Sequence, residues 1–155
     1  MKHIFFVLFI FSIIIFSASC SKNNNKSDIV PVDSPKSFSV LGFCVTAPDN
    51  SLNVKYAIVN KTVAEVNFDY MNDNYYYRAA RNLDELLSFY EYINDDDKII
   101  SDEETGIKIT IKRNNENNSI AFWNVNNINY SLYSDNKDDN IEALSLELMK
   151  SKAIK

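Results

Sequence analysis

The segment 64–79, AEVNFDYMNDNYYYRA, decides the fold class of this chain. From Ala64 to Tyr70 every second residue is apolar and the residues between are polar, which is the period of a half-buried β-strand. Asn72–Asn74 has the composition of a hairpin turn, and Tyr75–Ala79 then returns as a second strand. Because so short a connection joins only antiparallel neighbours, the segment predicts an antiparallel sheet.

The pattern continues on both sides of this hairpin. Further strands are expected at 43–47, 54–60, 99–100, 107–111, 120–125 and 130–133. Between them the apolar period changes to that of a helix over Leu83–Ile93, with Asn82 as its N-cap. A C-terminal helix is expected to turn Ile141, Leu144 and Leu148 to one side. We therefore predict an α+β domain: an antiparallel β-meander of about six to seven strands with one internal and one C-terminal helix packed on it.

The N-terminus has the three parts of a secretory signal. Lys2 precedes an apolar run of 13 residues, Ile4–Phe16, and small residues follow. A membrane-spanning helix needs roughly 20 such residues, so a permanent transmembrane anchor is the weaker alternative. Cys20 comes directly after the small residues and before a polar tract, an arrangement that resembles the lipobox of bacterial lipoproteins. Ser17 departs from that pattern, in which a leucine is usual.

The resemblance to a lipobox implies three regions. Residues 1–19 are a lipoprotein signal peptide, 20–37 are a lipidated Cys20 and a flexible tether, and 38–155 are a single α+β domain. The expected location is the extracytoplasmic side of the cell membrane, with Cys20 lipid-anchored there. The alternatives are a secreted protein that begins with a cysteine and, for the IVPV segment 29–32, an edge strand docked on the domain.

Composition limits the chemistry. Without residues 1–19 the chain has 136 residues and a net charge of 15 − 21 = −6, and its only histidine, His3, is gone. That excludes histidine-based catalysis, and the charge argues against nucleic acid as a partner. Cys44 is expected to be a buried or half-buried thiol in a strand. The acidic segment 135–140 lacks the EF-hand pattern, so we expect no metal, no cofactor and no enzyme activity.

Aromatic side chains are the remaining candidates for binding. In a strand, Tyr75 and Tyr77 point to one face of the sheet and Tyr76 to the other. With Trp123 and Tyr133, the pair Tyr75 and Tyr77 forms the predicted binding surface for a protein, peptide or glycan partner. The competing interpretation is that these rings pack in the core.

Five short motifs from Phe38 onward occur together: Gly42-Phe43-x-Val45-x-x-Pro48, Tyr76-Tyr77-Arg78-x-Ala80, Gly106-x-x-Ile109-Thr110-Ile111-Lys112, Ala121-x-Trp123 and Tyr130-Ser131-Leu132. The series resembles small secreted or lipid-anchored bacterial proteins that carry an uncharacterised domain, domain of unknown function 4367. Relatives often have glycines after the Tyr-Arg strand, where this chain has residues 82–86, NLDEL, so a more helical segment is expected. No activity is established for that family, so the resemblance implies no catalytic or binding residue.

Three functions follow as hypotheses. The first is a non-enzymatic, lipid-anchored binding or sensing module. The second is a carrier of an apolar ligand held between sheet and helices, which requires a cavity of roughly 300 Å³ or more. The third is a hydrolase with two carboxylates facing each other about 5–9.5 Å apart.

Overall fold

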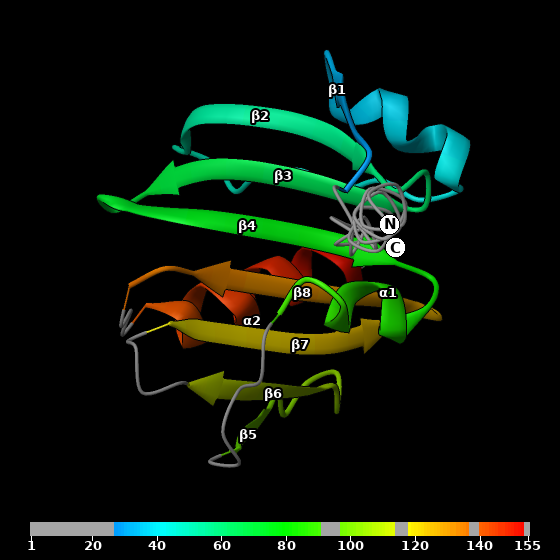
Figure 1. Cartoon of the computed structure of the whole chain (residues 1–155). Coiled ribbons are helices and arrows are strands. Elements are labelled where there is room, and N and C mark those ends of the chain that lie inside the picture. Colours follow the sequence, from blue (N-terminus) through cyan, green and yellow to red (C-terminus); the bar gives the residue numbers. More distant parts are fainter. Residues whose placement is uncertain (1–26, 91–96, 114–117, 137–139, 154–155) are drawn as a thin grey trace, which may run out of the picture.

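The computed structural model describes residues 27–90, 97–113, 118–136 and 140–153, which form one sheet with helices on both faces (Figure 1). Its strands and helices are, in chain order, β1 (Ile29–Val32), the 3-10 helix η1 (Pro35–Leu41), β2 (Leu52–Val59), β3 (Val63–Tyr70), β4 (Asp73–Ala80), α1 (Leu83–Leu87), β5 (Lys98–Ser101), β6 (Lys108–Arg113), β7 (Ser119–Val125), β8 (Ile128–Ser134) and α2 (Ile141–Ala153).

The predicted α+β class and antiparallel pairing are confirmed, with eight strands in the described residues in place of six to seven. The strand order is β1-β2-β3-β4-β8-β7-β6-β5, so the sheet consists of two four-stranded meanders. They join where β4 pairs with β8, whereas a single meander would pair β4 with β5. The chain therefore leaves β4 through α1 and returns at the far edge of the sheet as β5 (Figure 1).

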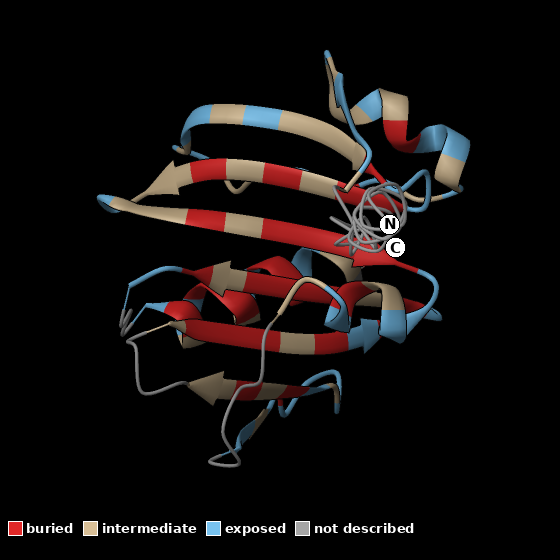
Figure 2. Ribbon diagram, viewed as in Figure 1, coloured by how far each residue is buried: buried red, intermediate tan, exposed pale blue. Residues whose placement is uncertain are grey.

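Most of the core lies between the sheet and the layer formed by α2 and η1. The buried face of α2 presents Ile141, Leu144 and Leu148, as its apolar period predicts. Phe38 of η1 is also fully buried and meets Tyr56 edge to face, with ring centroids 6.1 Å apart. Figure 2 shows the central strands as the most continuously buried part of the sheet. We call this side of the sheet the α2 face and the opposite side the α1 face.

The internal helix is shorter than its sequence pattern suggests. Asn82 caps it as predicted, because its side-chain oxygen accepts a hydrogen bond from the backbone N–H of Asp84 at 3.0 Å. The α-helical part ends at Leu87, and the chain then turns through Tyr90. The end of the predicted helix, residues 91–93, lies outside the described residues.

The folded domain begins earlier than expected. The IVPV segment forms β1, which pairs antiparallel with β2, so the edge-strand alternative is the observed one. Asp28 and Asn60 fix its start: the Asp28 N–H donates to the side chain of Asn60, and the Asn60 N–H donates to the carbonyl of Asp28 at 2.8 Å. The tether predicted to extend to residue 37 therefore ends before Asp28.

Two local predictions were wrong. Residues 43–47 form no strand; they follow η1 as an irregular segment in which only Val45 is fully buried. Cys44 is consequently exposed, with Sγ 3.4 Å from the carbonyl oxygen of Pro35. The β3–β4 turn is centred on Met71 and Asn72, which have φ of 50° and 74°, one to two residues before the expected position.

Candidate functional site

The aromatic residues predicted to form a binding surface are divided between the two faces of the sheet. Tyr75 and Tyr77 do share one side, but it is the α2 face, where both are fully buried and Trp123 is only 4% exposed. Tyr77, Trp123 and Tyr130 lie nearly parallel to one another there, with ring centroids 5.7–6.0 Å apart. The prediction of an exposed surface is therefore wrong for Tyr75, Tyr77 and Trp123, because the α2 and η1 layer covers them.

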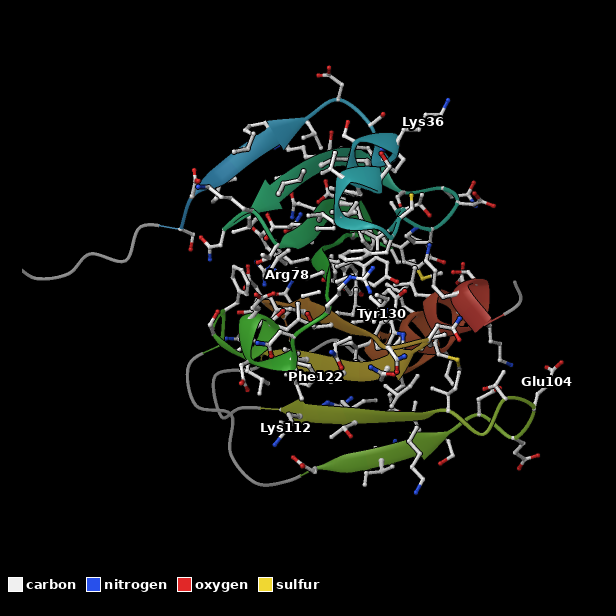
Figure 3. The ribbon with its side chains drawn as sticks, turned by 90° about the vertical axis from the view of Figure 1, so that its right-hand side faces the viewer. Lys36, Arg78, Glu104, Lys112, Phe122 and Tyr130 are labelled. Carbon is white, nitrogen blue, oxygen red and sulfur yellow. The ribbon has the colours of Figure 1, made fainter. Side chains whose placement is uncertain are left out.

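Tyr133 belongs to the other side. It pairs with Tyr76 across β4 and β8, with ring centroids 6.3 Å apart, and its ring also lies 5.5 Å from that of Tyr90. In Figure 3, Arg78 and Phe122 lie toward α1, whereas Tyr130 lies toward α2. The α1 face thus carries a second aromatic group, with a charged residue at its centre.

That charged residue is Arg78, which is 9% exposed. Its Nε–H donates to Oε2 of Glu65 at 2.7 Å, across the β3–β4 register. Its Nη1 donates to the hydroxyl of Tyr90 at 3.0 Å, and that hydroxyl lies 2.9 Å from the hydroxyl of Ser131. Three strands and the turn after α1 therefore meet in one network of hydrogen bonds.

Aromatic rings surround the same guanidinium. Its central carbon lies 4.3 Å from the ring centroid of Phe89, 5.1 Å from that of Tyr76 and 5.5 Å from that of Tyr90. Cation–π attraction of this kind stabilises a desolvated guanidinium. Arg78 with Glu65 therefore holds the segment after α1 against the sheet.

Burial and charge shift the ionisation of this network. Burial by itself would lower the pKa of Arg78, but Tyr90 and Glu65 outweigh that effect and the pKa is raised. Burial raises the pKa of Tyr90 even though Arg78 acts in the opposite direction. Burial, together with Asp135, raises the pKa of Tyr133 to about 12. At neutral pH these hydroxyls therefore remain protonated hydrogen-bond donors.

Beside the network, a groove of about 590 Å³ runs across β1 to β4 on the α1 face. Its lining is mainly apolar: Ile29, Pro31, Val32, Asp33, Val54, Lys55, Tyr56, Ala57, Glu65, Asn67 and Tyr76. The groove is open to solvent. It exceeds the volume expected of a carrier cavity, but it does not lie between sheet and helices as that hypothesis supposed.

Two polar side chains along this groove, those of Glu65 and Asn67, are engaged within the protein, whereas Asp33 and Lys55 are exposed. Oε2 of Glu65 accepts the hydrogen bond from Arg78. The side-chain N–H groups of Asn67 donate to Oδ1 of Asn74 at 2.8 Å and to the carbonyl of Tyr75 at 3.1 Å. The groove therefore offers mostly apolar surface to an occupant.

Comparison of the chain with protein-family models, with curated proteins and with solved structures finds no match. The resemblance to domain of unknown function 4367 therefore stays a prediction.

The remaining predicted site residues have mixed outcomes. Cys20 and the signal segment lie outside the described residues. Among the residues that are described, no helix is long and apolar enough to cross a membrane. The same part of the chain has no group of three or more His, Cys, Asp or Glu side chains placed to hold a metal ion. Asp33 and Glu65 both line the groove, but Glu65 is paired with Arg78, and the hydrolase hypothesis stays a prediction without an assigned pair of carboxylates.

Sequence reasoning missed both Arg78 and the groove. An arginine within the apolar and aromatic strand YYYRAA is the one signal that pointed to Arg78, because a charge inside such a strand needs a partner. Glu65 is the second residue of the hairpin's first alternating run, and the alternation predicts only that it lies on the polar face. The groove also depends on β1. The polar residues on both sides of segment 29–32 favour a tether, and an edge strand there was only the alternative.

Proposed function

We propose that this protein is a lipid-anchored, extracytoplasmic binding or sensing module without enzymatic activity, and that the groove across β1 to β4 is its binding site. The observation that carries the proposal is the groove itself, an open and mainly apolar concavity of about 590 Å³. Ligand sites are typically concavities of 300–1,000 Å³ with apolar walls and a few polar groups.

The surroundings support this assignment. The groove floor lies on strands whose side chains are fixed by the Glu65–Arg78 pair and by the Asn67 hydrogen bonds. A floor held in this way keeps its shape when empty, which reduces the ordering cost of binding. Ala57 lies in the middle of the groove, half-buried, between Pro31 of β1 and Glu65 of β3.

The binding proposal is tested by native mass spectrometry of protein extracted from membranes. Wild-type protein should carry a non-covalently bound species that the variant Ala57→Arg lacks, because an arginine there fills the groove. Circular dichroism shows whether the variant is folded. Identical spectra of the two proteins, with no bound species on either, would contradict the proposal.

The anchor is tested by metabolic labelling with a fatty acid. We expect label on the wild-type protein and none on Cys20→Ala, because Cys20 is the proposed acceptor. Cys44→Ala serves as the matched control and should keep its label. Labelling that survives Cys20→Ala would refute lipidation at this residue.

A further inference from the structure

The position of the groove relative to the proposed lipid anchor at Cys20 indicates which kind of ligand the groove binds. We propose that the groove binds one acyl chain of a lipid in the bilayer to which the protein is attached. This inference rests on the proposed function, because it assumes both the anchor at Cys20 and a ligand in the groove.

The first support is the short distance along the chain between the lipid and the groove. The domain is fixed from Asp28 onward by the two hydrogen bonds to Asn60. Cys20 is 28 − 20 = 8 residues away, which span at most about 28 Å even when fully extended. The start of β1 is thus held close to the bilayer surface, and Ile29, the next residue, already lines the groove.

The second support is the apolar character of the groove on its membrane-proximal side. Ile29 is 56% exposed, and Pro31, which lines the groove with it, also faces solvent. Exposing apolar side chains of this size to water is unfavourable, and their contact with acyl chains lowers the free energy. They place an apolar entrance where the chain enters the domain.

The third support is that the lining is mainly apolar and that its two most central polar side chains, Glu65 and Asn67, are already paired within the protein, which leaves Asp33 and Lys55 as its exposed charges. Glu65 is neutralised by Arg78, and the side-chain N–H groups of Asn67 are already used. A peptide backbone buried there would leave N–H and carbonyl groups without partners, at a cost of about 1–3 kcal/mol each. An acyl chain has no such groups, so it suits the groove better.

Charge argues against an anionic headgroup as the attraction. The chain without residues 1–19 has a net charge of −6, and the two exposed charged residues at the groove, Asp33 and Lys55, add no net positive charge to it. Anionic headgroups would be repelled, so the acyl chain and not the headgroup supplies the contact.

The test places a tryptophan at the groove entrance of the anchored, full-length mature protein. The variant Ile29→Trp is compared with Ile99→Trp, whose isoleucine is 61% exposed on the opposite edge strand. Both are reconstituted in phosphatidylcholine vesicles whose lipids carry bromine on the acyl chains. Bromine quenches tryptophan only at contact range and is absent from the protein's own lipid, so quenching reports bilayer lipid alone. The parent chain, with the buried Trp123, gives the blank.

We expect several-fold stronger quenching for Ile29→Trp than for Ile99→Trp, and loss of that difference when Ala57→Arg is added to fill the groove. Equal quenching, or quenching that persists with Ala57→Arg, would overturn the inference, because β1 would then only touch the surface. Dependence on added phosphatidylglycerol would overturn it too. Flotation with the vesicles separates the proposed anchor from the proposed acyl-chain site. Protein that does not float lacks the anchor. Protein that floats without selective quenching is anchored but does not bind an acyl chain in the groove.

Discussion

The guanidinium of Arg78 and the carboxylate of Glu65 meet across adjacent strands at 2.7 Å, with 11% and 13% of their side chains exposed. Arg78 also reaches the hydroxyl of Tyr90, so one buried cation joins β3 and β4 to the turn after α1. Because Glu65 lines the groove, the Arg78–Glu65 pair also fixes one wall of the proposed binding site.

Loss of the carboxylate should therefore be costly. We expect Glu65→Ala to lower the free energy of unfolding by about 2–4 kcal/mol, because it leaves Arg78 buried without a counter-ion. Lys98→Ala is the control: it breaks an ion pair of similar length, 2.6 Å to Glu142, but Lys98 is 56% exposed. That change should cost less than about 1 kcal/mol. Urea unfolding of both variants measures the difference, and equal losses would contradict the assigned role.

Two tyrosine hydroxyls should behave in opposite ways. Tyr90→Phe removes the acceptor of a charged donor, and we expect a loss of about 1–2 kcal/mol. The hydroxyl of Tyr77 is buried without a hydrogen-bond partner among the described residues. Tyr77→Phe should therefore be neutral or stabilising by up to about 1 kcal/mol. Thermal unfolding of the two variants checks the contrast, which fails if Tyr77→Phe is the more damaging change.

Much of the first meander could be predicted from local sequence. The alternation from Ala64 to Tyr70 sets which residues face the core, because a shift of one residue would expose the whole apolar set. The turn was misplaced because Met71 adopts a left-handed conformation at φ 50°, which nothing in its side chain favours. Asn is better suited to such conformations, and Asn126 and Asn127, which connect β7 to β8, both have positive φ.

The candidate site could not be predicted in the same way, because it depends on contacts between distant segments. Arg78 is enclosed only when Phe89 and Tyr90 fold back over the α1 face. The groove forms only when β1 pairs with β2. The sequence on both sides of β1 is polar and resembles a tether, so it does not predict this pairing. The alternation of the strand correctly predicts that Tyr75 and Tyr77 share one face of the sheet. It does not predict that α2 packs on that face and buries both rings.

The Met71 turn gives a prediction of its own. Met71 is 64% exposed, so Met71→Gly loses little packing and relieves the left-handed strain, with an expected gain of about 0.5–1 kcal/mol. Leu52 is similarly exposed at 68% but lies in a strand at ordinary φ. Leu52→Gly should instead cost about 0.5–1 kcal/mol. Denaturant unfolding gives both values, and a loss of stability in Met71→Gly would show that the turn is not strained.

Acid stability should depend on Asp102. Hydrogen bonds from Lys150 and Thr105 lower its pKa in the folded state, and Lys150 lies 3.0 Å from its carboxylate. Since the unfolded carboxyl takes up its proton first, stability from Asp102 is present above about pH 4 and is lost as the pH falls below it. Unfolding free energies measured across this range should decline less steeply in Asp102→Asn than in the wild type. Parallel curves would remove Asp102 from the account.

The central claim is that the groove between β1 and β4 is where this anchored protein meets its ligand. The most direct measurement is photo-crosslinking in intact cells from a benzoylphenylalanine placed at Lys55, an exposed residue that lines the groove without filling it. The comparison is benzoylphenylalanine at Lys108, which is exposed on the same face of the sheet but on β6. We predict a defined adduct from position 55 that is absent from position 108. The same adducts from both positions, or none from position 55, would contradict the claim.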